Sequence, residues 1–251
     1  MNHSVSNLLT IRLLAGAFLF VLPGSARATY SIVASDQMTQ QVGGAGTSCV
    51  GSLSVRIIYG VAIGYGAVHA QAQISTVGRD RAVVLLRDEV DPSDIIAEIT
   101  SSSFDPAASV RQYGIVDLSG RAAGFTGEND MPYAEDRQGF VDLYTYSVQG
   151  NILTSVRVID QAEAAFLSKF GCDLADRLML ALEAGAEGGE GDSRCTPRGI
   201  PSDSAFIEVD PKETAEGSYL RIEVTNTSPE NPLVPLRERF DAWRAENPCP
   251  K

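Results

Sequence analysis

The first 28 residues of this chain and the residue that follows them constrain the fold more than any other feature. A short region with Arg12 precedes ten apolar residues, a proline-glycine break, and small residues at Ala26 and Ala28. This order is typical of a secretory signal peptide cut after Ala28. Ten apolar residues are too few to cross a bilayer, which takes about 20. We therefore expect a signal peptide at 1–28 and a mature chain that begins at Thr29.

Two other interpretations of this segment stay open: a retained apolar helix that is buried in the fold, and a cut after Ala26. No later segment of the sequence is long and apolar enough to span a membrane. We therefore expect a periplasmic or secreted protein with no stable membrane association after cleavage.

A mature chain that begins at Thr29 would carry a nucleophile and a base in one residue. A free α-amine has a pKa near 8 and can accept the proton of the neighbouring hydroxyl at neutral pH. The cut that releases the signal peptide would then also create a catalytic group, with Ala28 and Thr29 on its two sides.

The mature chain is strongly acidic. Loss of Arg12 and Arg27 with the signal peptide lowers the formal net charge from −12 to −14. Such a surface repels polyanions, which argues against nucleic acid and anionic membranes as partners. The remaining 223 residues suffice for one substantial core.

All four cysteines lie in the mature chain, and an even count in an exported protein predicts two disulfides. The sequence leaves three pairings open. We favour Cys172–Cys195, which brackets one helix and a glycine-rich loop, and Cys49–Cys249 then follows by elimination. The alternative is that the cysteines are buried free thiols.

Strand and helix patterns occur in separate blocks along the chain. Residues 29–35 and 40–45 read as a hairpin, in a register that places Thr29 opposite about residue 47. Apolar spacing predicts helices at 156–170 and 172–184, and residues 128–142 read as a polar loop at the rim of an active site. Blocks of this kind favour an α+β fold of two sheets with helices outside. Further elements are predicted as strands at 57–59, 67–73, 113–118, 121–126, 143–148, 205–209 and 219–224, and as helices at 79–87, 92–100 and 236–245.

Few side chains are available for other chemistries. His69 is the single histidine of the mature chain, so a metal site built mainly from histidines is excluded and no metal or cofactor is expected. His69 shares one strand face with Gln71, as a structural polar stripe or as a pocket lining.

Three further residues could support a reacting Thr29. Asn151 is a candidate oxyanion donor, or a turn cap. Thr47 and Ser48 could orient the α-amine, or be ordinary strand hydroxyls.

Several segments resemble one bacterial family, DUF1028, a domain of unknown function. The resemblance covers residues 29–210, and the matching segments are 29–34 (TYSIVA), 111–117 (RQYGIVD), 123–127 (AGFTG), 147–153 (SVQGNIL), 174–178 (LADRL) and 181–185 (ALEAG).

Members of that family look like N-terminal nucleophile (Ntn) hydrolases with a four-layer αββα sandwich. The resemblance implies a domain of this type at 29–210 and amide-bond hydrolysis, with Thr29 in the position of the N-terminal threonine. Residues 211–251 would form a C-terminal extension of a strand and a helix.

We therefore expect an exported amidohydrolase that cleaves a small amide, N-acyl or peptide bond through an acyl-enzyme on Thr29. The alternative is a non-enzymatic periplasmic binding or interaction module on the same scaffold. The sequence leaves the substrate and the oligomeric state open.

Overall fold

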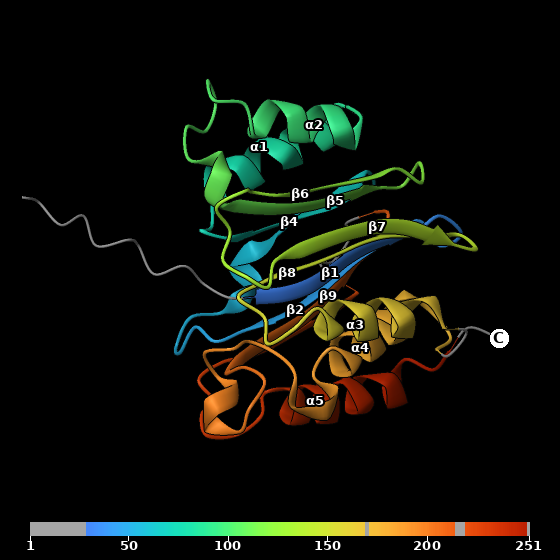
Figure 1. Ribbon diagram of the computed structural model, residues 1–251. Coiled ribbons are helices and arrows are strands. Elements are labelled where there is room, and N and C mark those ends of the chain that lie inside the picture. Colours follow the sequence, from blue (N-terminus) through green and yellow to red (C-terminus); the bar gives the residue numbers. More distant parts are fainter. Residues whose placement is uncertain (1–28, 169–170, 214–218, 250–251) are drawn as a thin grey trace, which may run out of the picture.

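The computed structural model describes residues 29–168, 171–213 and 219–249. They form a mixed α+β fold with two antiparallel sheets, of six and four strands. Figure 1 shows the two sheets face to face, with α1 and α2 on the outside of one and α3, α4 and α5 on the outside of the other. The predicted signal peptide, with its cut after Ala28, lies outside the described residues.

The six-stranded sheet has the order β10-β9-β2-β1-β8-β7, so the strand that begins at Thr29 is one of its two central strands. Its strands are β1 (Thr29–Asp36), β2 (Gln41–Ser48), β7 (Glu135–Val141), β8 (Tyr144–Asn151), β9 (Ser204–Asp210) and β10 (Leu220–Val224).

The four-stranded sheet has the order β3-β4-β5-β6 and packs on the first through contacts of β4 with β1 and of β5 with β8. Its strands are β3 (Tyr59–Ala62), β4 (Gly66–Ala72), β5 (Arg111–Asp117) and β6 (Ala122–Thr126).

Five α-helices of the described residues cover the outer faces of the two sheets. Three of them begin with a side-chain cap, Ser75, Asp91 or Asp173, and the cap at Asp91, which precedes a proline, is the one predicted from the sequence. The helices are α1 (Thr76–Arg87), α2 (Pro92–Ile99), α3 (Arg157–Leu167), α4 (Leu174–Ala184) and α5 (Leu233–Glu246). The end of the helix predicted at 156–170 includes Phe170, which lies outside the described residues.

Alternation along β1 divides the core. Tyr30, Ile32 and Ala34 face the helices, in one apolar cluster with α3 and α4. Val33, between them, belongs to a second cluster that lies between the sheets. Thr29, at the start of the strand, is on the same face as Val33. The first residue of β1 therefore points at the opposite sheet.

The segment after Asp210 shares this core. β10 pairs with β9 along the edge of the six-stranded sheet. Leu236 and Phe240 of α5 pack into the same apolar cluster as α3 and α4. In the described residues, no helix is long and apolar enough to span a membrane.

The expectation of a loop over residues 128–142 is wrong for its second half, which forms β7. β7 is an edge strand, and most of its side chains are polar or charged because one of its sides has no strand neighbour. The apolar alternation that marks a half-buried strand is therefore absent from its sequence.

Both expected disulfide pairings, Cys172–Cys195 and Cys49–Cys249, are wrong. The structure joins Cys49 to Cys195 and Cys172 to Cys249, with Cα separations of 5.8 and 5.7 Å. Cys172 and Cys195 lie beyond opposite ends of α4, whose 11 residues span about 16 Å. A disulfide tolerates a Cα separation of only about 4.4–6.8 Å, so these two cannot pair.

The packing of α5 explains the observed partner of Cys172. The end of α5 returns to the start of α4, where Arg244 Nη2 lies 2.6 Å from the carboxylate of Asp173. The chain then continues to Cys249 beside Cys172. Two disulfides indicate that the protein resides in an oxidising compartment outside the cytoplasm.

Candidate functional site

Thr29 lies between two polar partners at one end of the six-stranded sheet. It is directly opposite Ser48 of β2 and Asn151 of β8. The register predicted from the hairpin is correct to within one residue. Side chains opposite each other share a face, and the Thr29 hydroxyl donates to Ser48 Oγ at 3.1 Å. Strand pairing alone therefore brings three of the predicted site residues together.

The second sheet contributes Gln71, from β4. Its Nε2 donates to the main-chain carbonyl of Thr29 at 3.2 Å and to Gln112 Oε1 at 2.8 Å. Thr29 is 2 % exposed in the uncut chain, and Gln71 and Asn151 are each 1 % exposed. These polar side chains are thus buried together at one end of the layer between the sheets, and Gln71 links Thr29 to the four-stranded sheet.

Thr47 does not join this group. It lies in β2, one residue before Ser48, and so its side chain points to the other face. There its hydroxyl contacts Ser202 and donates to the carbonyl of Ser204 at 2.8 Å. These contacts hold the start of β9 beside β2, and they do not orient Thr29.

His69 lies between the sheets but reaches Thr29 only through other residues. Its Nδ1 is 2.8 Å from Ser31 Oγ, and Ser31 in turn donates to Gln71 Oε1 at 2.6 Å. Tyr59 and Phe206 pack against the imidazole ring. The structure places His69 in a buried polar network instead of at a surface that a substrate could reach.

Burial sets the charge of His69. Complete desolvation lowers the pKa of the imidazole from 6.5 to about 3, so the ring is neutral at physiological pH. As the pH falls below 6.5, His69 takes up a proton in the unfolded chain at a higher pH than it does in the folded protein. Stability should therefore decrease between pH 6.5 and about 3, by up to about 1.4 kcal/mol per pH unit.

A chain that begins at Thr29 allows a direct measurement, because His69 is its one histidine. The imidazole resonances of His69 should not shift between pH 8 and pH 5 in NMR spectra of the folded protein. In 8 M urea the same resonances should titrate near pH 6.5. A folded-state midpoint near 6.5 would contradict the buried neutral ring.

Sequence reasoning missed Gln112, the second residue of β5. It links the site residues of both sheets, because its Oε1 accepts from Gln71 at 2.8 Å and from Asn151 Nδ2 at 3.0 Å. The signal available in the sequence was its alternation with the apolar residues of the same strand, which places it on the inner face.

Asp130 was also missed. It precedes Met131, whose carbonyl accepts from the main-chain N–H of Ile152, the residue after Asn151. Burial raises the pKa of the Asp130 carboxyl to about 7, and its Oδ2 has no hydrogen-bond partner in the described part of the chain. An acid that titrates near neutrality therefore lies in the loop beside the Thr29 end of the sheet.

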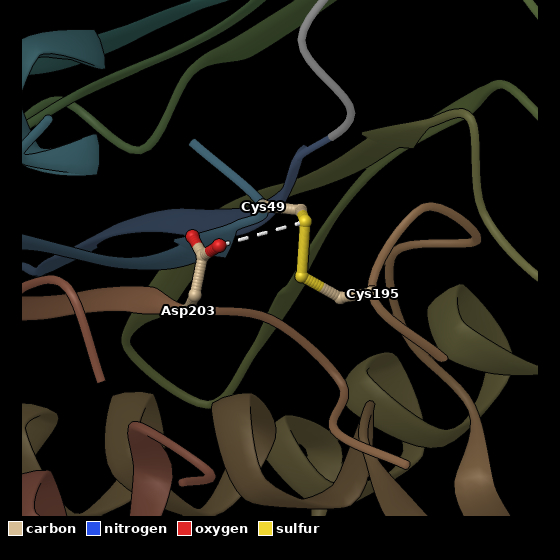
Figure 2. Close-up of side chains that lie close together, drawn as sticks. All are labelled: Cys49, Cys195 and Asp203. Atoms are coloured by element: carbon tan, nitrogen blue, oxygen red, sulfur yellow. Dashed lines mark hydrogen bonds between the residues drawn. A yellow bond between two sulfur atoms is a disulfide. The ribbon is translucent and has the colours of Figure 1, made fainter. Parts of the chain in front are cut away.

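The loop that follows Ser48 is held in place from several directions. Figure 2 shows the disulfide from Cys49 to Cys195, with the Asp203 carboxylate 3.7 Å from the sulfur of Cys49. Asp203 also accepts from the main-chain N–H groups of Val50 at 2.7 Å and of Gly51 at 2.9 Å. These contacts fix the end of β2, and with it the partner of the Thr29 hydroxyl.

Side chains of metal-binding type gather at two places among the described residues. Each group holds two cysteines and one aspartate. Thiolates bind metals, whereas these sulfurs are used in disulfides. Each group is thereby reduced to a single carboxylate, and neither is a candidate metal centre. The groups are Cys49, Cys195 and Asp203, and Cys172, Asp176 and Cys249.

Comparison with known proteins places the chain in a family. Residues 29–234 match the model of a family described as a family of unknown function, DUF1028. The chain belongs to the DUF1028 family. No curated protein matches this DUF1028 protein.

A solved structure has the same fold as this DUF1028 protein. Protein SPO2555 from Silicibacter pomeroyi, a DUF1028 crystal structure, is 25 % identical, with a TM-score of 0.69. The similarity covers 86 % of this chain and 89 % of that one. The family match begins at Thr29, the residue at which β1 begins.

Proposed function

We propose that this DUF1028 protein is exported to the periplasm or secreted, cut after Ala28, and active as an amidohydrolase of the Ntn type with Thr29 as its nucleophile. The observation that carries the proposal is the position of Thr29. It is the first residue of a central strand, with Ser48, Asn151 and Gln71 around it. Two facing sheets with helices outside agree with an Ntn-type αββα sandwich (Figure 1).

The chemistry follows from the two groups of a free N-terminal threonine. The α-amine takes the proton of the hydroxyl, and Oγ1 attacks the amide carbonyl to form a tetrahedral intermediate. The amine returns the proton to the leaving nitrogen, which departs as an amine and leaves an ester on Thr29. Water, activated by the same α-amine, hydrolyses the ester and restores the hydroxyl. The reaction consumes one amide and one water and needs no redox partner.

The substrate is a small amide, an N-acyl compound or a peptide. The net charge of the mature chain, −14 after loss of the two signal arginines, disfavours nucleic acid and anionic membrane surfaces as partners. Ser48 supplies the acceptor that holds the Thr29 hydroxyl in the uncut chain, at 3.1 Å.

The sharpest test compares two chains that differ by one residue. The first begins at Thr29 and the second at Ala28, so both contain every side chain of the site but only the first has a basic nitrogen on Thr29. An acylating probe such as a β-lactone should form an adduct on Thr29 in the first chain alone, detected by peptide mass spectrometry. A panel of N-acyl amides should be hydrolysed by that chain alone.

Two results would contradict the proposal. Equal labelling of the two chains would mean that the α-amine takes no part. Absence of any adduct or hydrolysis in a folded chain that begins at Thr29 would favour the binding-module alternative. The intact mass of the exported protein tests whether the chain begins at Thr29, because this mass should correspond to a chain without residues 1–28.

A further inference from the structure

The orientations of three amide side chains near Thr29 can be assigned from the main-chain groups around them. Gln71, Gln112 and Asn151 each offer an oxygen that only accepts and a nitrogen that only donates. Which end points where is decided by the groups around it. Main-chain carbonyls are the most informative neighbours, because they can only accept.

Gln112 is oriented first. Its Nε2 is 2.9 Å from the carbonyl oxygen of Gly150 and 3.1 Å from that of Glu135. An oxygen in that place would face two acceptors, so the nitrogen must be there. The Oε1 of Gln112 therefore faces the opposite way, toward Gln71 and Asn151.

The orientation of Asn151 follows. An oxygen at Gln112 requires a donor opposite, and Asn151 Nδ2 supplies it at 3.0 Å. The other end of the amide, Asn151 Oδ1, is buried and finds no hydrogen-bond partner among the described residues. A buried acceptor without a donor costs about 1–3 kcal/mol. The uncut chain thus holds an acceptor that lacks its donor.

Thr29 is the residue of β1 that pairs with Asn151. It stands directly opposite Asn151 across β1 and β8, where side chains of a pair share a face about 4.5–5.5 Å apart at Cβ. The Thr29 hydroxyl already donates to Ser48. In the uncut chain the Thr29 nitrogen is a peptide nitrogen, and a cut after Ala28 turns it into an amine with additional N–H groups.

We propose that Gln112 is a positioning residue that holds Asn151 with Oδ1 toward Thr29, where this oxygen accepts a hydrogen bond from the free α-amine. This inference rests on the proposed function for the cut that frees the amine. It gives Asn151 a different role from the oxyanion donor expected from the sequence. An amine that donates to Asn151 keeps its lone pair available for the proton of the Thr29 hydroxyl.

The pKa of the α-amine reports this bond without any substrate. An acceptor stabilises the protonated amine and raises the pKa, so its removal lowers the pKa. One hydrogen bond corresponds to a shift of roughly 0.5–1 unit. In the chain that begins at Thr29, Asn151→Ala should lower the pKa of the amine by this amount. Gln112→Leu, which frees Asn151 to rotate, should lower it in the same direction.

The measurement is the pH dependence of acetylation of the Thr29 amine, followed by mass spectrometry of the N-terminal peptide, with circular dichroism to confirm folding. Ser147→Ala is the matched control. It removes a buried hydroxyl of the same layer that contacts Gln149 and Gln138, and it should leave the pKa of the amine unchanged.

An unshifted pKa of the α-amine in folded Asn151→Ala and Gln112→Leu overturns the inference. If Asn151→Ala also loses about 10²–10³ in kcat while this pKa is unshifted, Asn151 is assigned to stabilising the oxyanion instead. A shift in both variants but not in Ser147→Ala supports the inference. Because acetylation needs no turnover, a chain with the expected shifts and no hydrolysis would reject the proposed function while the role of Gln112 and Asn151 stands.

Discussion

Replacing Thr29 by alanine in a chain that begins at this residue is expected to abolish the proposed amide hydrolysis, with a loss on the order of 10⁴ to 10⁶ in kcat/KM. Alanine keeps the α-amine but removes the oxygen that attacks the carbonyl, so no acyl-enzyme can form. Thr29→Ser keeps the hydroxyl and should retain part of the activity and the probe adduct. Steady-state hydrolysis of the best amide from the panel measures all three proteins.

Ser35→Ala is the matched control for this series. Ser35 lies on the same face of β1, is equally buried, and donates to the carbonyl of Asp117 at 2.8 Å, far along the strand from Thr29. Its loss removes one buried hydrogen bond and should lower stability by about 1 kcal/mol without changing kcat. Full activity in Thr29→Ala, or equal losses in the two alanine variants, would rule out Thr29 as the nucleophile.

The two disulfides should stabilise the fold to a similar degree but differ in their effect on activity. The Cys49–Cys195 bond joins residues 146 apart, and the Cys172–Cys249 bond joins residues 77 apart. Loss of either by paired Cys→Ser substitution should cost about 4–5 kcal/mol on the chain-entropy model. Urea denaturation of each double variant measures this cost.

Activity separates the two bonds, because only one of them adjoins the site. Cys49 follows Ser48, the partner of the Thr29 hydroxyl. Removing Cys49–Cys195 should therefore lower kcat at temperatures where the variant is still folded, whereas removing Cys172–Cys249 should not. Equal kcat values for the two folded variants would show that the disulfide has no part in holding Ser48.

The sequence predicts well those features of the fold that depend on interactions between residues close together in the chain. The hairpin register at Thr29 was correct to one residue because a tight turn fixes it, in which Asp36 accepts from the main-chain N–H of Met38 at 2.8 Å. The helix start at Asp91 is predicted for the same reason, whereas the helix predicted at 79–87 begins three residues earlier, at Thr76. Capping and turn residues act within a few positions of the chain.

What the sequence could not predict depends on contacts between distant elements. The disulfide pairing follows from the return of α5 to the start of α4, which no spacing of cysteines encodes. Gln112 lies within a segment that resembles the family, yet its importance comes from Gly150 and Glu135 in the other sheet. The polar strand β7 can be recognised as a strand only from its pairing with β8.

The central position of β1 in the sheet has a consequence for the order of signal-peptide removal and folding. A signal peptidase needs an extended, accessible segment on both sides of the bond it cuts, whereas folding pairs Thr29 with strands on both sides. If the cut falls after Ala28, processing and folding compete for the same residues. The leader must then be removed before β1 is sealed between β2 and β8, and a chain that folds too early would keep its leader and stay inactive.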